Sequence, residues 1–277
     1  MNRFLKLVNF ELGRFMKIYL VLVGITIISQ FAGVIAQSKD YLNHAETVMF
    51  ERAMNMGAYV EAYGAMSMRQ VTASLWFMGP IALSAAALIF YCFFIWYRDW
   101  LGKNTFIYRL LMLPTARLNV FLSKAAAIFL MVLGLISLQI VLLPLLSTVL
   151  QWTVPADLRL DMNVHEIINN IYQLQIIIPD TFVGFLVAYG IGFMAVFVVF
   201  TAILFERSFR LKGALMGAGY AILSGVIFLG PVILQISPNT RFLYPGELFA
   251  VELVLLLLVS GVSIWLSHFL LKKKITV

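Results

Sequence analysis

The chain has 277 residues, of which 62% are hydrophobic and only 12% are charged, against roughly 25% charged residues in ordinary soluble domains. This composition excludes a soluble globular protein and indicates an integral membrane protein. The net charge of +7 does not indicate a nucleic-acid partner, because the cations lie between apolar runs. The single cysteine, Cys92, excludes an intrachain disulfide.

Residues 1–17 are expected to form a short amphipathic helix. Its apolar residues recur at helical spacing, as Phe4, Leu5, Val8, Leu12 and Phe15. Its cations lie mostly opposite, as Arg3, Lys6, Arg14 and Lys17. This pattern is typical of a helix that lies in the membrane interface. The alternative is a basic tail that only sets the topology.

Six apolar runs are long enough to cross a hydrocarbon core, which takes about 20 helical residues. They are predicted at 18–36, 72–96, 119–149, 181–204, 214–236 and 248–270. The first run is too long for a signal-peptide core and is expected to be a retained anchor. Three runs contain prolines that can bend a helix, Pro80, Pro144 and Pro231. Short loops are expected at 205–213 and 237–247.

The fifth run begins with a cluster of small residues, which allow helices to approach closely. They are Gly213, Ala214, Gly217, Ala218, Gly219 and Ala221. The sequence is compatible with a dimer contact, with packing within the chain and with no special role for these residues.

The segment from Arg98 to Lys124 is the longest basic stretch between two apolar runs. It holds five cations against the single acid Asp99. Each lysine or arginine at mid-membrane costs roughly 2.5–3.5 kcal/mol, so we expect this segment at the cytoplasmic surface. Residues 98–114 are predicted to form a short amphipathic helix that Pro114 ends, because proline lacks the N–H of a helix interior.

Two longer segments lie between spans, at 37–70 and 151–180. The first is rich in methionine and tyrosine and is expected to be helical; Met54, Tyr59 and Tyr63 belong to it. It fits either a vestibule that meets an amphipathic cargo, since methionine suits varied apolar partners, or the packed interior of a small helical hairpin. The second places its apolar residues on one helical face: Val164, Ile167, Ile168, Ile171 and Tyr172.

The distribution of charge predicts the orientation. Fifteen of the twenty lysines and arginines fall in the N-terminal segment, the 98–124 segment, the loop at 205–213 and the tail. Three of the thirteen acids fall on that side, Glu11, Asp99 and Glu206. Both termini are therefore expected in the cytoplasm.

Several catalytic signatures are missing. The sequence contains no G-x-x-x-x-G-K-[ST] motif, so ATP would have to be hydrolysed by another subunit. His165-Glu166 does not continue as H-E-x-x-H, because Asn169 holds the fourth position. With three scattered histidines we expect no metal site, and an intramembrane serine hydrolase is disfavoured because neither Ser224-Gly225 nor Ser260-Gly261 has a G-x-S context.

The span interiors hold almost no ionisable groups, and such groups usually mark an ion pathway where they occur. Glu252 is the main candidate. It is expected about one turn inside the sixth span, where a helix dipole favours a carboxylate, and either a structural or a cargo-contacting role is open. A coupling ion is not expected.

The 98–124 segment resembles the cytoplasmic loop after the second span of ABC-2 type transporter permeases. The resemblance rests on Lys103-Asn104-Thr105, on Arg109-Leu110-Leu111-Met112-Leu113-Pro114, on Arg117 and on Lys124. Asn104 stands where that family often has glycine, with Gly102 two residues earlier. The alternative for the segment is a solvated basic loop that follows the positive-inside rule.

The resemblance implies an all-α membrane protein, similar to type V exporters, with six transmembrane helices, an N-terminal elbow helix and two extracytoplasmic helical segments. It implies a permease in a bacterial plasma membrane that exports amphipathic peptides or other hydrophobic cargo. Its partners would be two ATPase subunits, which bind ATP and Mg²⁺, and a second permease copy or a paralogue. The chain itself would hold no cofactor.

The resemblance also assigns roles to residues. Contact with the ATPase is expected at Leu101, Gly102, Lys103, Asn104, Thr105, Phe106, Arg109 and Pro114. A second contact is expected at Arg207 and Arg210, and cargo contacts at Met54, Tyr59, Tyr63 and Glu252. The alternative from another class is a membrane sensor or scaffold that transports nothing.

Overall fold

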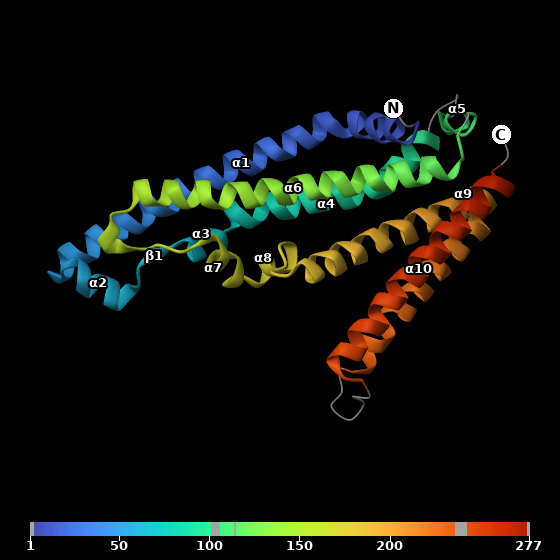
Figure 1. The fold of residues 1–277 in the computed structure, drawn as a ribbon. Helices are drawn as coiled ribbons and strands as arrows, with labels where there is room; N and C mark the ends of the chain where they lie inside the picture. The colour runs from blue at the N-terminus through green and yellow to red at the C-terminus, as the bar shows by residue number, and fades with distance from the viewer. Residues whose placement is uncertain (1–2, 101–105, 114, 236–242, 276–277) are drawn as a thin grey trace. The chain divides into compact units, whose positions relative to one another are not determined.

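The computed structural model describes residues 3–100, 106–113, 115–235 and 243–275. In these ranges the chain is almost entirely helical (Figure 1). The long helices are α1 (Arg3–Arg52), α4 (Leu75–Trp100), α6 (Leu118–Thr153), α9 (Phe182–Leu234) and α10 (Pro245–Lys273). The short elements are α2 (Met56–Tyr63), β1 (Met66–Ser67), α3 (Met68–Thr72), α5 (Phe106–Leu111), η1 (Ala156–Leu158), β2 (Arg159–Leu160), α7 (Val164–Asn169) and α8 (Tyr172–Ile177).

The five long helices are each long and apolar enough to cross a membrane, within the part of the chain that the structure describes. This supports the prediction of a helical membrane protein. The longest of them, α9, has 53 residues and is interrupted at Arg210, whose φ of 54° and ψ of −129° are not helical. It therefore consists of two helical arms, joined at a corner.

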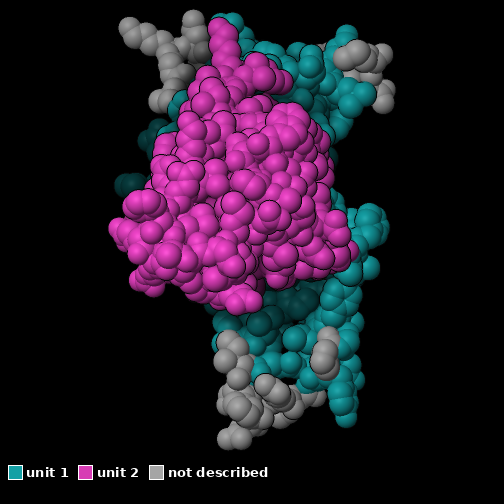
Figure 2. Space-filling model, turned by 90° about the vertical axis from the view of Figure 1, so that its left-hand side faces the viewer, with its two compact units in different colours: residues 1–14, 88–130, 181–277 teal, residues 15–87, 131–180 magenta. Residues whose placement is uncertain are grey.

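The chain divides into two compact units, coloured separately in Figure 2. Unit 1 comprises residues 1–14, 88–130 and 181–277, and unit 2 comprises residues 15–87 and 131–180. Each unit gathers segments that are distant in the sequence.

In unit 1, the arms of α9 fold back on each other as a hairpin. A Cβ atom at Gly213 would lie 2.0 Å from the carbonyl oxygen of Phe205, and one at Gly217 would lie 2.6 Å from that of Ala202. Only glycine permits such close approach of two helix backbones. Of the interpretations left open for the small residues, packing within the chain is confirmed at these two glycines.

The helix α10 packs beside the α9 hairpin, and Figure 1 shows it running along the second arm. Buried hydroxyl groups link the two helices. Thr201 lies with its Oγ1 2.9 Å from Ser267 Oγ, and the hydroxyl of Tyr220 lies 2.6 Å from that of Ser263. An apolar cluster around Met194, Phe228 and Val259 completes this packing.

In unit 2, residues from α1, α4 and α6 form an apolar core together with the short elements. Its fully buried members include Tyr59, Ile167 and Leu174. The strands β1 and β2 form a two-residue parallel bridge that pairs Met66 with Arg159. The helical prediction did not include this bridge, because two residues are too few to give a strand pattern.

Several boundaries differ from those expected. The expected elbow helix and first span form one continuous helix, α1, since no proline or glycine pair interrupts the sequence between them. The expected loop at 205–213 is helical except at Arg210. The helices α4, α6 and α9 continue through Pro80, Pro144 and Pro231, because a single lost backbone hydrogen bond does not end a helix that its neighbours support.

The two segments between spans also differ. The extension of α1 to Arg52 takes up nearly half of the first segment, and most of the remainder forms α2, β1 and the start of α3. The expected single helical face at 164–172 is split between α7 and α8. Ile167, Ile168 and Ile171 are buried, whereas Tyr172 is exposed.

Candidate functional site

The centre of the candidate site in unit 1 is Lys124, which lies in the second turn of α6 and is fully buried. Its Nζ donates to Glu11 Oε1 of α1 at 2.6 Å and to Asp99 Oδ2 of α4 at 2.5 Å. It also donates to the carbonyl oxygen of Ile95 at 3.3 Å and lies 5.4 Å from the ring centroid of Trp96. One ammonium group thus joins three helices.

Two arginines bind the remaining carboxylate oxygens. Arg98 Nη2 donates to Glu11 Oε2 at 3.0 Å, and Arg14 Nη1 donates to Asp99 Oδ1 at 2.7 Å. Both oxygens of each carboxylate therefore have a cationic partner, as a buried ionic group requires. We call Glu11, Arg14, Arg98, Asp99 and Lys124 the charge network.

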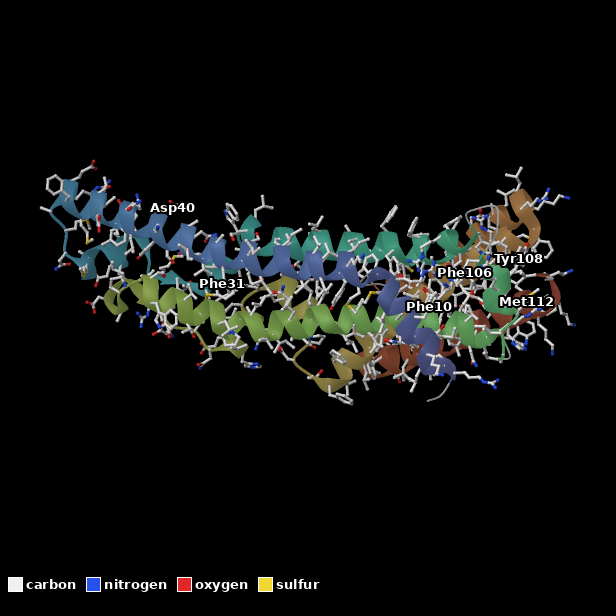
Figure 3. All side chains as sticks on the ribbon, turned by 90° about the horizontal axis from the view of Figure 1, so that it is seen from above. Phe10, Phe31, Asp40, Phe106, Tyr108 and Met112 are labelled. Atoms are coloured by element: carbon white, nitrogen blue, oxygen red, sulfur yellow. The ribbon has the colours of Figure 1, made fainter. Side chains whose placement is uncertain are left out.

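The short helix α5 rests on this network through an aromatic pair. The rings of Phe106 and Phe10 stack at 5.7 Å, and the guanidinium carbon of Arg14 lies 5.1 Å from each centroid. Figure 3 shows Phe10 and Phe106 together, with Tyr108 and Met112 farther out. A guanidinium over aromatic rings is attracted by about 0.5–2 kcal/mol. Arg14 thus contacts α5 on one side and Asp99 on the other.

The two faces of α5 differ. Ile107, Leu110 and Leu111 are buried, and Leu110 packs with Leu7 and Val120. Tyr108 and Arg109 are exposed, as is Met112 just beyond the helix, at 71%. The spacing of the buried residues, three and four apart, anchors one side of this helix and leaves the other side available to a partner.

The corner of α9 carries a second group of polar and aromatic residues. The hydroxyl of Tyr97 donates to Glu206 Oε2, and the guanidinium carbon of Arg207 lies 4.6 Å from the Tyr97 centroid. Arg207 and Arg210 both line an open hollow of about 400 Å³. The expected second contact pair therefore shares one concave surface.

Arg117 connects the end of α10 to the segment before α6. Its Nη1 donates to the carbonyl oxygens of Leu271 at 2.7 Å and Ile275 at 2.9 Å. The last carbonyls of a helix have no partner within it, so Arg117 caps α10. The C-terminal end of α10 and the N-terminal end of α6 consequently lie together in unit 1.

The expected cargo residues belong to different units: Met54, Tyr59 and Tyr63 lie in unit 2, and Glu252 lies in unit 1. Tyr59 is fully buried in unit 2, where its ring stacks on Tyr63 at 5.0 Å. Burial, followed by the neighbouring Tyr63, raises the pKa of Tyr59 and keeps its phenol neutral. Met54 is partly buried against the same core. These contacts favour the packed-interior interpretation of the segment, although Tyr63 remains 40% exposed.

Glu252 is partly buried in α10 and lies seven residues after Pro245. The helix dipole acts within the first turn of a helix. Because α10 begins at Pro245 rather than at 248, Glu252 lies beyond that turn. Glu247 takes the capping position instead, and its Oε2 accepts from the backbone N–H of Tyr244 at 2.9 Å.

Of the expected ATPase-contacting residues, Phe106 and Arg109 lie on α5. The others, Leu101, Gly102, Lys103, Asn104, Thr105 and Pro114, lie outside the described residues. Of the expected helix over 98–114, Arg98 to Trp100 belong to α4, and Phe106 to Leu111 form α5.

The charge network itself was not predicted. Its members were interpreted as topology signals, although two features of the sequence point to it. Glu11 lies three residues after Val8 and four before Phe15, within the apolar face of α1. Lys124 follows Val120, Phe121 and Leu122, inside an apolar run. A charge at such a position needs an opposite charge nearby.

The chain matches no protein-family model, no curated protein and no solved structure at a significant level. The likeness to ABC-2 permeases therefore rests on the residues of the 98–124 segment and on the pattern of apolar helices.

Proposed function

We propose that this chain is the membrane-spanning permease subunit of an ABC exporter, with both termini in the cytoplasm and ATP hydrolysed by a separate subunit. One observation carries the proposal: α5 is seated on the charge network and has an exposed outer face. A partner that moves α5 moves Phe106, which contacts Arg14. Arg14 is bonded to Asp99, and Asp99 is bonded to Lys124.

This arrangement can convert a push on α5 into a displacement of α1, α4 and α6. Each ionic contact in the network joins different helices, apart from a 3.9 Å contact of Arg14 with Glu11 on α1. Closure of two ATPase subunits upon ATP binding would supply the push, and the spans would then repack and release cargo outward. The proposed cargo, amphipathic peptides or other hydrophobic molecules, follows the family resemblance.

Two further observations support six crossings. The corner at Arg210 divides α9 into two apolar arms, so the five long helices supply six apolar segments. Arg117 also brings the end of α10 to the start of α6. The chain between these two points must therefore cross the membrane an even number of times, as it does if α6, both arms of α9 and α10 each cross once.

The test is co-purification of an ATPase subunit with the tagged, gently solubilised chain. Arg109→Ala removes an exposed cation from α5, and we expect it to reduce the recovered ATPase without lowering chain stability. Lys272→Ala, which removes an exposed cation from the end of α10, is the matched control and should retain the ATPase.

Phe106→Ala separates docking from transmission. Because the Phe106 ring packs on Phe10 and Arg14, the variant should retain the ATPase. It should weaken the dependence of ATP hydrolysis on cargo, because Arg14 loses one of its two aromatic contacts. Recovery of no ATPase with the wild-type chain would contradict the proposal and favour a membrane sensor or scaffold.

A further inference from the structure

A groove lies between the N-terminal turns of α1 and the helix α5 within unit 1. It has a volume of about 400 Å³ and its apolar lining comes from Leu7, Phe10, Phe106, Leu110 and Leu113. This volume falls in the range of about 300–1,000 Å³ that ligand pockets occupy. Phe10 and Leu113 are each 41% exposed, so the apolar lining is open at the surface.

Two cations, Arg3 and Lys6, line the same groove, and both side chains are exposed. The described residues that line the groove include no acid. Lys6 and Arg3 are three residues apart on α1 and therefore project from the same side of the helix. The groove thus combines an apolar floor with a positive edge.

We propose that this groove binds an anionic phospholipid, with the phosphate on Arg3 and Lys6 and an acyl chain along Phe10 and Leu113. The complementarity is one of both charge and polarity: a phosphate suits the cations, and a hydrocarbon chain suits the apolar lining. The groove lies at the end of α1 that carries most of its cations, and basic residues beside a membrane helix attract anionic lipids by about 1 kcal/mol each.

The bound lipid also acts on the charge network. Phe10 and Phe106 contribute to the groove and contact the guanidinium of Arg14. An acyl chain against these rings restrains α5 and so favours one arrangement of Arg14 and Asp99. This second step, control of the transmission from α5, rests on the proposed function, whereas lipid binding does not.

The test uses photoactivatable phosphatidylglycerol with a diazirine on its acyl chain, and a phosphatidylcholine probe with the same chains. The full-length chain is reconstituted in phosphatidylcholine vesicles that contain a small fraction of one probe, irradiated and digested. Mass spectrometry then locates the labelled peptides. We expect the phosphatidylglycerol probe to label the peptides that contain Phe10 and Leu113 more strongly than the phosphatidylcholine probe does.

Two variants test the two parts of the groove. Arg3→Gln with Lys6→Gln should lower labelling by phosphatidylglycerol at least about tenfold, given about 1 kcal/mol for each cation. Leu113→Asp places a carboxylate in the groove at an exposed position and should lower it as well. Lys272→Gln with Lys273→Gln makes the same change in charge at α10 and should leave the labelling unchanged.

Equal labelling of the Phe10 and Leu113 peptides by the two probes, or no effect of the Arg3 and Lys6 changes, would each overturn the proposal. Labelling of the long apolar helices by both probes alike is the expected background. Loss of ATPase recovery in the Arg3→Gln, Lys6→Gln variant, with lipid labelling unchanged, would instead identify the groove as a protein-docking surface. Selective lipid labelling without any ATPase partner would support the lipid site and contradict the exporter function.

Discussion

Lys124 is the residue whose replacement should affect stability most. Lys124→Met keeps the apolar stem but leaves one oxygen each of Glu11 and Asp99 without its cation. Breaking a buried ion pair by removing one partner costs about 3–5 kcal/mol. We expect a loss of that size in the free energy of unfolding, measured by chemical denaturation in mixed micelles.

A second substitution distinguishes the network from simple packing. Asp99→Asn added to Lys124→Met removes one of the two stranded charges, so the double variant should lose less stability than the sum of the single losses. The coupling should be of order 0.5–3 kcal/mol. Lys17→Met, at an exposed position of α1, should change stability by less than about 0.5 kcal/mol. Strict additivity of the two changes would show that Lys124 and Asp99 do not act together.

Arg210 occupies a backbone conformation that glycine adopts readily and other residues adopt rarely, with φ of 54° and ψ of −129°. Such a conformation costs about 1–3 kcal/mol. Arg210→Gly should therefore stabilise the chain by about 1 kcal/mol in thermal unfolding. Arg207→Gly, three residues earlier within the helix, should destabilise it by a similar amount. A loss of stability in Arg210→Gly would show that the corner is not strained.

At the scale of single elements, the α9 hairpin depends on two glycines. Gly217→Ala places a methyl group where it would lie 2.6 Å from the carbonyl oxygen of Ala202, so the arms must separate. The expected loss of stability is about 1–3 kcal/mol. Gly219→Ala is the control, because a Cβ atom there meets nothing within 4 Å, and helix propensity alone should make it neutral or stabilising.

Thermal unfolding of the purified variants in detergent measures this difference. Equal effects of the Gly217 and Gly219 changes would show that the arms do not touch at Gly217. A larger loss for Gly213→Ala than for Gly217→Ala is also expected, since a Cβ atom at Gly213 would approach a carbonyl oxygen more closely, to 2.0 Å.

Long apolar runs predicted where the long apolar helices lie, because about 20 apolar residues in sequence leave few other structures open. They did not predict where those helices end. The helix α1 continues to Arg52, because polar residues with adequate helix propensity follow its apolar part. The break between the arms of α9 was expected within 205–213, but residues 205–212 contain no glycine or proline, so the sequence does not indicate that the break is confined to Arg210.

The candidate site was predictable only in its outer part. The basic 98–124 segment predicted that Phe106 and Arg109 belong to the site, and both lie on α5. The charge network depends on contacts between residues as far apart as Glu11 and Lys124. Periodicity along the chain shows which face of a helix is apolar, but it does not show which distant charges meet.

At the scale of the whole molecule, a chain with six membrane crossings and a chain with five place Tyr244 on opposite sides of the membrane. We expect single cysteines at Met112, Leu211 and Lys272 to react with a membrane-impermeant maleimide from the cytoplasmic side. Cysteines at Phe50 and Tyr244 should react from the opposite side. Met112, Leu211, Phe50 and Tyr244 are well exposed, at 71%, 86%, 90% and 78%.

Each single cysteine is introduced into a Cys92→Ser background, which removes the one native cysteine, a buried residue of α4. Reaction of Tyr244→Cys from the same side as Leu211→Cys would show that the second arm of α9 does not cross the membrane. It would leave five crossings and place the two termini on opposite sides.

The buried ammonium group of Lys124 also has a consequence for biosynthesis. Glu11 and Asp99 precede Lys124 in the chain, so both carboxylates have left the ribosome before the lysine emerges. A lysine at mid-membrane costs roughly 2.5–3.5 kcal/mol, and one in the second turn of a span, such as Lys124, costs less. The carboxylates of α1 and α4 can offset that cost only if these helices remain beside the translocon. In Glu11→Gln with Asp99→Asn, insertion of α6 during translation should therefore become less efficient, which protease protection of nascent chains would detect. The order in which the charges are synthesised thus favours assembly of α1, α4 and α6 before α9 and α10 are synthesised.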